Sequence, residues 1–391
     1  MSLDEARRVI DEAIRARVFP AAAIEVGNSD SALWTDALGT LTFETSSPPT
    51  DLHTPFDLAS LTKVVATTTV VMELVRTGAL DLDQRVSACF ADWRGADREP
   101  VTVRDLLEHA SGLAARLLDP PPVGRREFEH DIGAMPLEYS PRSRSIYSDL
   151  GFILLGFVAA DRGRASLATQ FDLITVRLKP NTTGDKAAAA ISDVGSVRLQ
   201  ANRDVGSVRR PLGGPRDRQP DLLTFDLPAD VRRFAAPTRP MDEDGRRGRL
   251  LVGDVHDNYA VALGGVAGHA GMFGTAPALG AFARVVLRAS RGDPNSPAPF
   301  SPPLVAAFTT KGVVPGSSRA LGWDTMLPTS SCGARMSSLA FGHVGFTGTS
   351  LWIDPARDRY FVLLTNRVCD GGTVDEMRAA RRAFHDALSD V

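Results

Sequence analysis

The chain has little of the cysteine that disulfide frameworks and thiolate metal clusters require. Its 391 residues include three cysteines, Cys89, Cys332 and Cys369, and none of them stands in a Cys-x-x-Cys pair. This spacing excludes a disulfide framework and a thiolate cluster. The sequence also lacks any run of 18 apolar residues, which excludes a transmembrane helix.

The chain also lacks a large excess of charge of either sign. The formal net charge is -3 at pH 7, so no basic surface argues for a nucleic-acid partner. Residues 1–17 alternate charged and apolar side chains and contain no apolar stretch typical of a signal peptide. We therefore expect a cytoplasmic protein whose partner is a small molecule, and the composition leaves its oligomeric state open.

Several motifs with known chemistry are absent. No serine has glycine on both sides, so the nucleophile elbow of the α/β-hydrolases is missing, and no H-E-x-x-H, Walker or G-x-G-x-x-G pattern occurs. His256, Asp257 and His269 lack the paired spacing of metal ligands, and we interpret the histidines as structural. No metal site and no organic cofactor are expected.

Hydrophobic periodicity predicts strands near both ends of the chain and helices between them. Strand patterns cover 21–26, 31–38, 341–354 and 359–367, and helix patterns cover 3–17, 60–77, 102–109, 151–160, 277–289 and 374–388. This arrangement predicts an α+β fold, in which helices flank an antiparallel sheet built from both termini and a mostly helical region is inserted.

The predicted fold divides the chain into three stretches. Residues 1–58 form the N-terminal part of the α/β region, 59–250 a mainly helical region, and 251–391 the C-terminal part that completes the α/β region. Residues 180–223 contain no aromatic side chain, and the sequence Asp-Val-Gly-Ser-Val-Arg occurs twice within them. We expect a mobile surface insertion there, with a functional lid as the alternative.

The strongest chemical signal is Ser60-Leu-Thr-Lys63 at the start of the predicted helix 60–77. Residues three apart share a helix face, and the helix N-terminus favours negative charge on a serine oxygen. Only four of the 44 basic residues are lysines, and Lys63 precedes an apolar run. Burial would lower the pKa of Lys63 and make it a proton acceptor. The alternative is a capping serine with a lysine that reaches the surface.

Two further segments carry candidate residues. Tyr147-Ser148-Asp149 lies before an apolar helix, where a tyrosine hydroxyl could relay a proton, although a tyrosine at the core edge is the alternative. Residues 342–349 hold three glycines within seven positions of a predicted strand. Such density indicates close approach of the backbone to a ligand or a helix, with a bulged edge strand as the alternative.

Together these segments resemble the serine β-lactamase and penicillin-binding protein superfamily, in its class C-like branch. That superfamily has S-x-x-K, Y-x-N or S-x-N, and K-T-G or H-T-G motifs in this order. The matching residues here are Ser60 to Lys63, Tyr147 to Asp149, and His343-Val344-Gly345. The resemblance covers most of residues 10–390 and includes residues 56–59, 102–113 and 264–271.

The resemblance implies a role for each matching residue. Ser60 would be the nucleophile, Lys63 its base and Tyr147 the proton relay to the leaving group. The backbone N–H groups of Ser60 and Phe346 would form the oxyanion hole. Substrate binding would involve the following residues of the second and third motifs: Asp149, His343, Val344 and Gly345, with His343 as a polar or cationic neighbour of Tyr147.

Two departures from the family pattern bear on the substrate. Asp149 replaces an amide donor with an acceptor, and Val344 lacks the hydroxyl that helps hold a substrate carboxylate. We therefore expect a carboxylesterase that hydrolyses small neutral acyl esters through an acyl-enzyme. The alternatives are a β-lactamase or D-alanyl-D-alanine carboxypeptidase and, from another class, a non-catalytic binding or sensor protein on the same fold.

Overall fold

A six-stranded antiparallel sheet forms the centre of the computed structural model, which describes residues 3–117, 120–178 and 221–388. The strand order is β2-β1-β9-β8-β7-β6. The strands are β1 (Ala21–Gly27), β2 (Ala32–Gly39), β6 (Asp324–Thr325), β7 (Phe341–Val344), β8 (Ser350–Asp354) and β9 (Arg359–Thr365). Of the predicted mobile insertion 180–223, all but residues 221–223 lies outside the described residues.

The two ends of the chain meet in the middle of this sheet. Strand β1 pairs with β2 on one side and with β9 on the other, with Ala22 opposite Thr365 and Gly27 opposite Tyr360. Both pairings are antiparallel. The α+β prediction of one sheet built from both termini is therefore confirmed.

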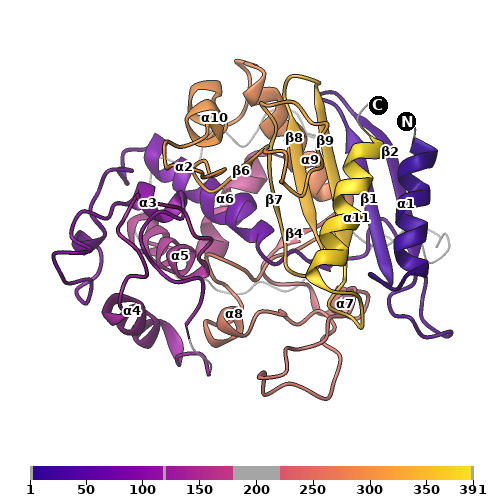
Figure 1. Cartoon of the computed structure of the whole chain (residues 1–391), viewed down its shortest axis with the longest axis horizontal. Helices are drawn as coiled ribbons and strands as arrows, with labels where there is room; N and C mark the ends of the chain where they lie inside the picture. The colour runs from indigo at the N-terminus through magenta and orange to yellow at the C-terminus, as the bar shows by residue number, and fades with distance from the viewer. Residues whose placement is uncertain (1–2, 118–119, 179–220, 389–391) are drawn as a thin grey trace, which may run out of the picture.

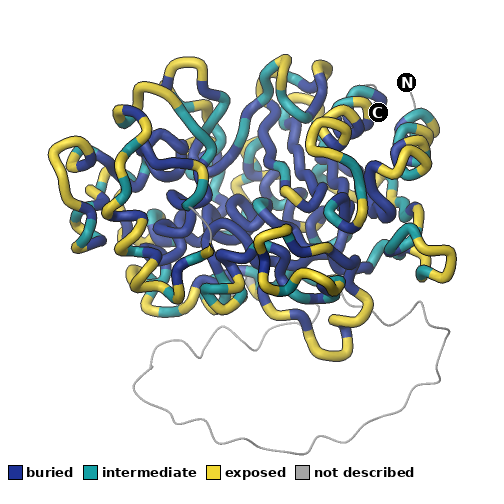
Figure 2. The backbone as a smooth tube through the Cα atoms, turned by 60° about the horizontal axis from the view of Figure 1, so that its bottom comes forward, coloured by how far each residue is buried: buried dark blue, intermediate teal, exposed yellow. Residues whose placement is uncertain are grey.

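Helices cover both faces of the sheet. Helices α1 (Leu3–Arg15) and α11 (Val374–Ala387) lie against one face, and α9 (Ala276–Ser290) lies against the other (Figure 1). Side chains alternate along β1, so Ile24 packs with the first pair of helices and Ala23 packs toward α9. The buried residues run continuously from this sheet into the helical part of the chain (Figure 2).

The helical part lies beside the sheet and carries a second, three-stranded sheet. Its strands are β3 (Phe56–Asp57), β5 (Phe273–Gly274) and β4 (Leu223–Thr224), in that order. The remaining helices are α2 (Thr69–Arg76), α3 (Val103–Leu107), α4 (Gly124–Ala134), α5 (Asp149–Gly163), α6 (Leu167–Leu178), α7 (Ala229–Arg232), α8 (Asn258–Ala262) and α10 (Pro302–Thr309). None of the helices in the described ranges is long and apolar enough to cross a membrane.

The helix predicted over residues 60–77 is present, but it is not a regular α-helix throughout. It winds as a π-helix over Lys63–Thr68 before it continues as α2. Such π-helical turns are rare and are frequent at functional sites. Thr67 Oγ1 donates to the carbonyl of Gly268 at 2.6 Å, and the N–H of Met272 donates to Thr62 Oγ1 at 3.2 Å. The segment 268–272 is therefore bonded along the first turns of this helix.

The single strand predicted over residues 341–354 is wrong. Two strands, β7 and β8, form a hairpin there, and residues 345–349 are the turn between them. The glycines do allow the close backbone approach that we inferred from their density. A Cβ atom added to Gly345 would lie 2.6 Å from the carbonyl oxygen of Leu58, so this turn packs directly on the chain before Ser60.

Candidate active site

The backbone turn before Ser60 is held by a buried carboxylate. Asp57, in β3, accepts hydrogen bonds from the N–H of Ala59 at 2.8 Å and from the N–H of His256 at 2.7 Å. Ala59 has a positive φ of 46°, which a residue with a side chain adopts only when its surroundings enforce it. The Asp57 contacts fix this conformation and present Ser60 at the start of the helix.

Lys63 lies directly beside Ser60. Its side chain is fully buried, and Nζ donates to Ser60 Oγ at 2.9 Å, to Asp149 Oδ1 at 2.8 Å and to the carbonyl of His269 at 3.1 Å. A carboxylate and a carbonyl can only accept, so Lys63 donates to both of them, and the hydroxyl of Ser60 can accept a third hydrogen bond from an ammonium group. The ion pair with Asp149 favours the charged form of Lys63.

The pKa of Lys63 does not show the net lowering that we expected from burial. Burial is the largest influence and acts to lower this pKa, but the negative charge of Asp149 and its hydrogen bond to Lys63 act to raise it. The pKa of Lys63 is consequently raised above its ordinary value. A raised pKa favours the protonated form of Lys63.

Asp149 is shared between two cations. One carboxylate oxygen accepts from Lys63, and the other accepts from Arg116 Nη1 at 3.0 Å. Burial alone would raise the pKa of Asp149, but the charge of Lys63 contributes to lowering it below its usual range. The acidic residue that replaces the amide of the family pattern thus holds the lysine in its charged form.

Arg116 connects this ion pair to a second carboxylate. Its Nη1 also donates to Asp257 Oδ2 at 3.1 Å, and its Nη2 donates to Asn258 Oδ1 at 2.8 Å. The opposite oxygen of Asp257 lies 2.8 Å from His269 Nε2. His269 therefore has an electrostatic partner in the site and supplies a carbonyl to Lys63, a position that its sequence context did not indicate.

Tyr147 lies against the same lysine. The ammonium group of Lys63 is 4.8 Å from the centre of the Tyr147 ring, and the rings of His109 and His343 flank that ring at 4.7 and 5.8 Å. Loss of contact with water raises the pKa of Tyr147, although the charge of Lys63 acts in the opposite direction. Tyr147 is accordingly a neutral phenol at neutral pH.

His343 is a neutral imidazole rather than a cation. Its Nδ1 lies 2.9 Å from the carbonyl oxygen of Val344 and donates to it, which leaves Nε2 as an acceptor. Burial lowers the pKa of His343 well below its ordinary value, and the charges of Arg319 and Lys63 add to this effect. His343 is therefore a polar rather than a cationic neighbour of Tyr147.

The turn between β7 and β8 is fastened to the chain before Ser60. Thr347 Oγ1 donates to the carbonyl of Asp57 at 2.8 Å, and Thr349 Oγ1 donates to that of Leu58 at 3.0 Å. Within the described ranges, the backbone N–H groups of Ser60 and Phe346 have no hydrogen-bond acceptor. Two free donors held near a serine hydroxyl are suited to stabilise an oxyanion.

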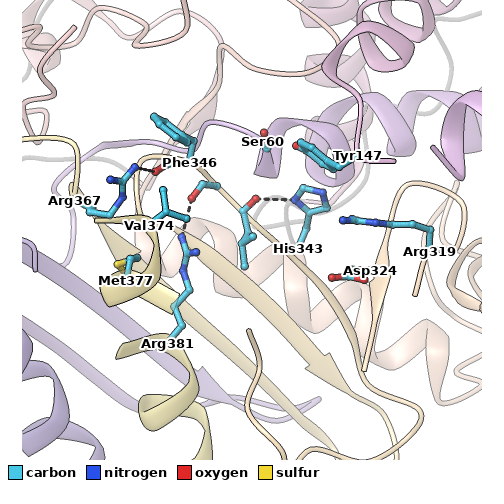
Figure 3. Close-up of a pocket in the computed structure, with 12 residues that line it drawn as sticks. Ser60, Tyr147, Arg319, Asp324, His343, Phe346, Arg367, Val374, Met377 and Arg381 are labelled. Atoms are coloured by element: carbon cyan, nitrogen blue, oxygen red, sulfur yellow. Dashed lines mark hydrogen bonds between the residues drawn. The ribbon is translucent and has the colours of Figure 1, made fainter. Parts of the chain in front are cut away.

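Two cavities open on either side of Ser60, and Ser60, Tyr147 and Phe346 line both of them. The first has a volume of about 230 Å³ and extends along β7 past His343 and Val344 (Figure 3). The second, of about 250 Å³, contains the small or apolar side chains of Ala59, Ala115, Met241 and Ala270 above the Arg116 network. A substrate bound at Ser60 can therefore place its two ends in different surroundings.

The first cavity carries an excess of positive charge. Its charged lining residues are Arg319, Arg367, Arg381 and Asp324. None of the three arginines forms an ion pair with a described residue. The guanidinium of Arg319 lies 5.2 Å from the ring centre of Tyr147 and has no hydrogen-bond partner in the described part of the chain. It is available to an anionic group in the cavity.

Sequence reasoning missed the arginines of the site. Arg116 and Arg319 lie in loops far from the three motifs, and Arg381 lies in the C-terminal helix, so no local spacing connects them to Ser60. The strong preference for arginine over lysine also conceals them, because the chain contains 40 arginines. All the residues expected from the motifs line one or both cavities, except Lys63, which lies beneath Ser60.

Comparisons with known proteins show the family to which the sequence is similar. A family model described as Beta-lactamase matches residues 6–385. A candidate D-alanyl-D-alanine carboxypeptidase of Escherichia coli is 28% identical over 341 residues, covering 80% of this chain and 69% of the relative. An N-acetylmuramyl-L-alanine amidase of Bacillus subtilis is 29% identical over 335 residues, covering 81% and 68%.

Solved structures share the fold at low sequence identity. EstCE1, described as a hydrolase with promiscuous acyltransferase activity, superposes with a TM-score of 0.70 at 18% identity, covering 99% of this chain and 98% of its own. A class C beta-lactamase from Rhodobacter sphaeroides superposes with a TM-score of 0.67 at 16% identity, covering 98% and 99%.

Proposed function

The chain belongs to the Beta-lactamase family of serine hydrolases, and on this premise we propose that it hydrolyses a small ester or amide through an acyl-enzyme on Ser60. One observation carries the proposal. Ser60 Oγ lies 2.9 Å from the buried ammonium of Lys63, in the wall common to two cavities. This position gives the hydroxyl both a stabilising charge and access to a substrate.

The proton of Ser60 moves through Tyr147 in this proposal. As Ser60 Oγ bonds to the substrate carbonyl carbon, its proton passes to the Tyr147 oxygen, and the phenol gives its own proton to the leaving group. Lys63 stays an ammonium and stabilises negative charge on Oγ, in place of the base role that the motif suggests. The N–H groups of Ser60 and Phe346 bind the oxyanion.

Deacylation follows the same path in reverse. Water attacks the ester carbon on Ser60, its proton passes through Tyr147 to Ser60 Oγ, and the carboxylic acid product leaves. Because the phenol both accepts and donates, neither step needs a neutral lysine. His343 and Asp149 support this relay, the first as a neutral ring beside Tyr147 and the second as the counter-charge of Lys63.

For the substrate, we propose an ester or amide that carries a carboxylate at one end, the class to which β-lactams and D-alanyl peptides belong. Arg319 supports this choice, because its unpaired guanidinium in the first cavity offers the charged donor that Val344 lacks. The apolar lining of the second cavity suits a short acyl group at the other end. The two relatives named above, a carboxypeptidase and an amidase, act on amide bonds according to their names.

A carboxylesterase for neutral esters is the second candidate. Val344 favours it, because a valine on the strand that lines the first cavity offers no hydrogen bond to a carboxylate. The sequence alone favoured the neutral ester over the carboxylate-bearing substrate. The proposal reverses this preference because the three motifs do not reveal Arg319 as a residue of the site.

A matched pair of substrates tests the proposal. The acetate esters of 3-hydroxybenzoate and 3-hydroxybenzamide have the same shape and differ in one charge. The proposal expects the kcat/KM of the anionic benzoate ester to exceed that of the uncharged benzamide ester by about 10–150-fold. This factor is the equivalent of a charged hydrogen bond of about 1.5–3 kcal/mol. Equal or inverted values would favour the neutral carboxylesterase. No turnover of either ester above that of Ser60→Ala would favour a non-catalytic binding protein.

A further inference from the structure

Two buried arginines lie behind the turn that carries Phe346. Arg381, in α11, is 7% exposed, and Arg367, which follows β9, is 8% exposed. Neither of them forms an ion pair with a carboxylate of the described residues. Burying a charge without a counter-charge is unfavourable, so each guanidinium needs compensating interactions.

Main-chain carbonyls supply that compensation, and all but that of Gly372, which accepts from Arg367, belong to one turn. Arg381 Nη2 donates to the carbonyls of Gly345 at 2.7 Å and Thr349 at 2.9 Å. Arg367 Nη2 donates to that of Phe346 at 2.8 Å (Figure 3). Arg381 Nε is buried and has no acceptor among the described residues. Within the described part of the chain, the hydrogen bonds of the Arg381 side chain are thus directed at this turn alone.

The carbonyl of Gly345 and the N–H of Phe346 belong to the same peptide group. This peptide is trans, so its C=O and N–H bonds point in opposite directions from one rigid plane. A guanidinium that fixes the oxygen on one side consequently fixes the direction of the N–H on the other. A charged donor on the oxygen also polarises the peptide and makes its N–H a stronger donor.

We propose that Arg381 is a positioning residue that orients and polarises the Gly345–Phe346 peptide as an oxyanion donor. Arg367 holds the next peptide in the same way. The inference rests on the proposed function, because it requires a tetrahedral intermediate on Ser60. Negative charge that develops in that intermediate then lies in the field of two buried cations that no described carboxylate neutralises.

The two threonine contacts of the turn complete the support from the front. Thr347 and Thr349 bind the turn to the chain that precedes Ser60, whereas the arginines bind it from the side of β9 and α11. The Phe346 N–H is therefore held relative to Ser60 by four side chains that come from three separate parts of the sequence.

Variants at Arg381 test the proposal against a matched control. Arg381→Met removes the charge and both hydrogen bonds, and Arg381→Lys keeps a charge that can reach one carbonyl. The control is Arg382→Met in the same helix, since Arg382 also donates to carbonyls, those of Ser330 and Pro328, but away from the cavities. The readouts are kcat and KM for an ester, the inhibition constant of a phenylboronic acid, which forms a tetrahedral adduct with a catalytic serine, and the Tm.

We expect Arg381→Met to lower kcat by about 10–100-fold, somewhat less than the 10²–10³-fold, roughly, of losing an oxyanion donor outright. The affinity for the boronic acid should fall by a similar factor, while KM changes by less than about threefold, because only the tetrahedral state uses the donor. Arg382→Met should leave all three values unchanged.

The lysine variant adds a pH signature that a purely structural role would not give. Burial lowers the pKa of Arg381 to about 9, and the charge of Arg367 contributes. A lysine loses its proton more readily than an arginine, so Arg381→Lys should recover part of kcat at pH 6 and lose it as the pH rises. Arg367, His343 and His385 are the titratable or charged groups facing this position, and burial lowers the pKa of both histidines far enough to keep them neutral over that range.

Two outcomes would overturn the inference. Arg381→Met could retain the kcat and boronic acid affinity of the wild type, or kcat and affinity could fall with the Tm and show no recovery in Arg381→Lys at low pH. A wild-type protein that forms no boronic acid adduct at Ser60 would instead overturn the proposed function, which separates the two failures.

Discussion

Arg116 lines the second cavity beside Ser60 and Arg319 lines the first, and their two guanidinium groups have opposite surroundings. Arg116, in the second cavity, contacts Asp149, Asp257 and Asn258. Arg319, in the first, faces the cavity with no hydrogen-bond or ion-pair partner among the described residues. A cation that is paired with carboxylates maintains structure, whereas one in a cavity without such a partner is available to a ligand.

This difference assigns separate tasks to the two sides of the site. On the Arg116 side, the guanidinium group is paired with carboxylates in a network that ends at Lys63. In this network, Asp149 raises the pKa of that lysine. The Arg319 side leaves its charge available for the substrate. Ser60, Tyr147 and Phe346 line both cavities, and in the proposed mechanism they carry out the reaction common to every substrate.

The largest expected effect comes from breaking the Arg116 side at Asp149. In Asp149→Asn the carboxylate that raises the pKa of Lys63 is lost, so burial dominates and that pKa falls. Because the proposed reaction needs the ammonium form, kcat/KM should decrease with rising pH by about tenfold for each unit above the new pKa. The wild type should show no such decrease over the same range, and a pH–rate profile of both measures this.

Asp257→Asn is the control for that variant. It also removes a carboxylate from Arg116, but it leaves the pair of Lys63 and Asp149 intact. Its pH profile should follow that of the wild type. If Asp149→Asn instead became more active as the pH rises, Lys63 would act as a neutral base and the assignment of the proton to Tyr147 would be wrong.

The next largest effect is expected at Arg319. Arg319→Gln should lower kcat/KM for the ester of 3-hydroxybenzoate by about 10–150-fold, since a charged hydrogen bond contributes about 1.5–3 kcal/mol. For the uncharged ester of 3-hydroxybenzamide, kcat/KM should change by less than about threefold, because this substrate has no carboxylate for Arg319 to bind. A parallel loss on both substrates would remove Arg319 from substrate recognition.

The smallest expected effect is on the stability of the folded protein, which should distinguish Arg116 from Arg319. Arg116→Gln leaves Asp149 and Asp257 with less counter-charge, and the free energy of unfolding should fall by about 1–3 kcal/mol. This is below the range of about 3–5 kcal/mol for fully buried pairs, because the Arg116 side chain is 33% exposed. Arg319→Gln, which breaks no ion pair, should change it by less than about 0.5 kcal/mol. Urea unfolding of both variants makes the comparison, and similar losses would contradict it.

The sequence predicts much of the fold because its signals are local. The helix predicted over residues 102–109 and the strands predicted over 21–26 and 31–38 depend on neighbouring residues alone. Both features are present: the helix begins with a capping box of Thr102 and Asp105, and the two strands pair with each other. The split of residues 341–354 into two strands was not predicted, because the glycines were interpreted as a close backbone approach or a bulge rather than as a turn, and this turn packs against the chain before Ser60.

The candidate site was predictable only as far as its motifs extend. Ser60 and Lys63 share a helix face, so their contact follows from spacing. The charge state of Lys63 does not, because it depends on a carboxylate 86 positions away in the chain. Arg116 and Arg319 likewise reach the site through tertiary structure, and without them the sequence favoured a neutral substrate.

The central claim is that Ser60 forms an acyl-enzyme with substrates that reach both cavities. Its most direct test is the mass of the intact protein quenched during turnover of the ester of 3-hydroxybenzoate, followed by peptide mapping. We expect a population that is heavier by one acetyl group on the peptide containing Ser60, and no such population in Ser60→Ala. Turnover without acetylation, or acetylation of another residue with Ser60→Ala still active, would contradict the account.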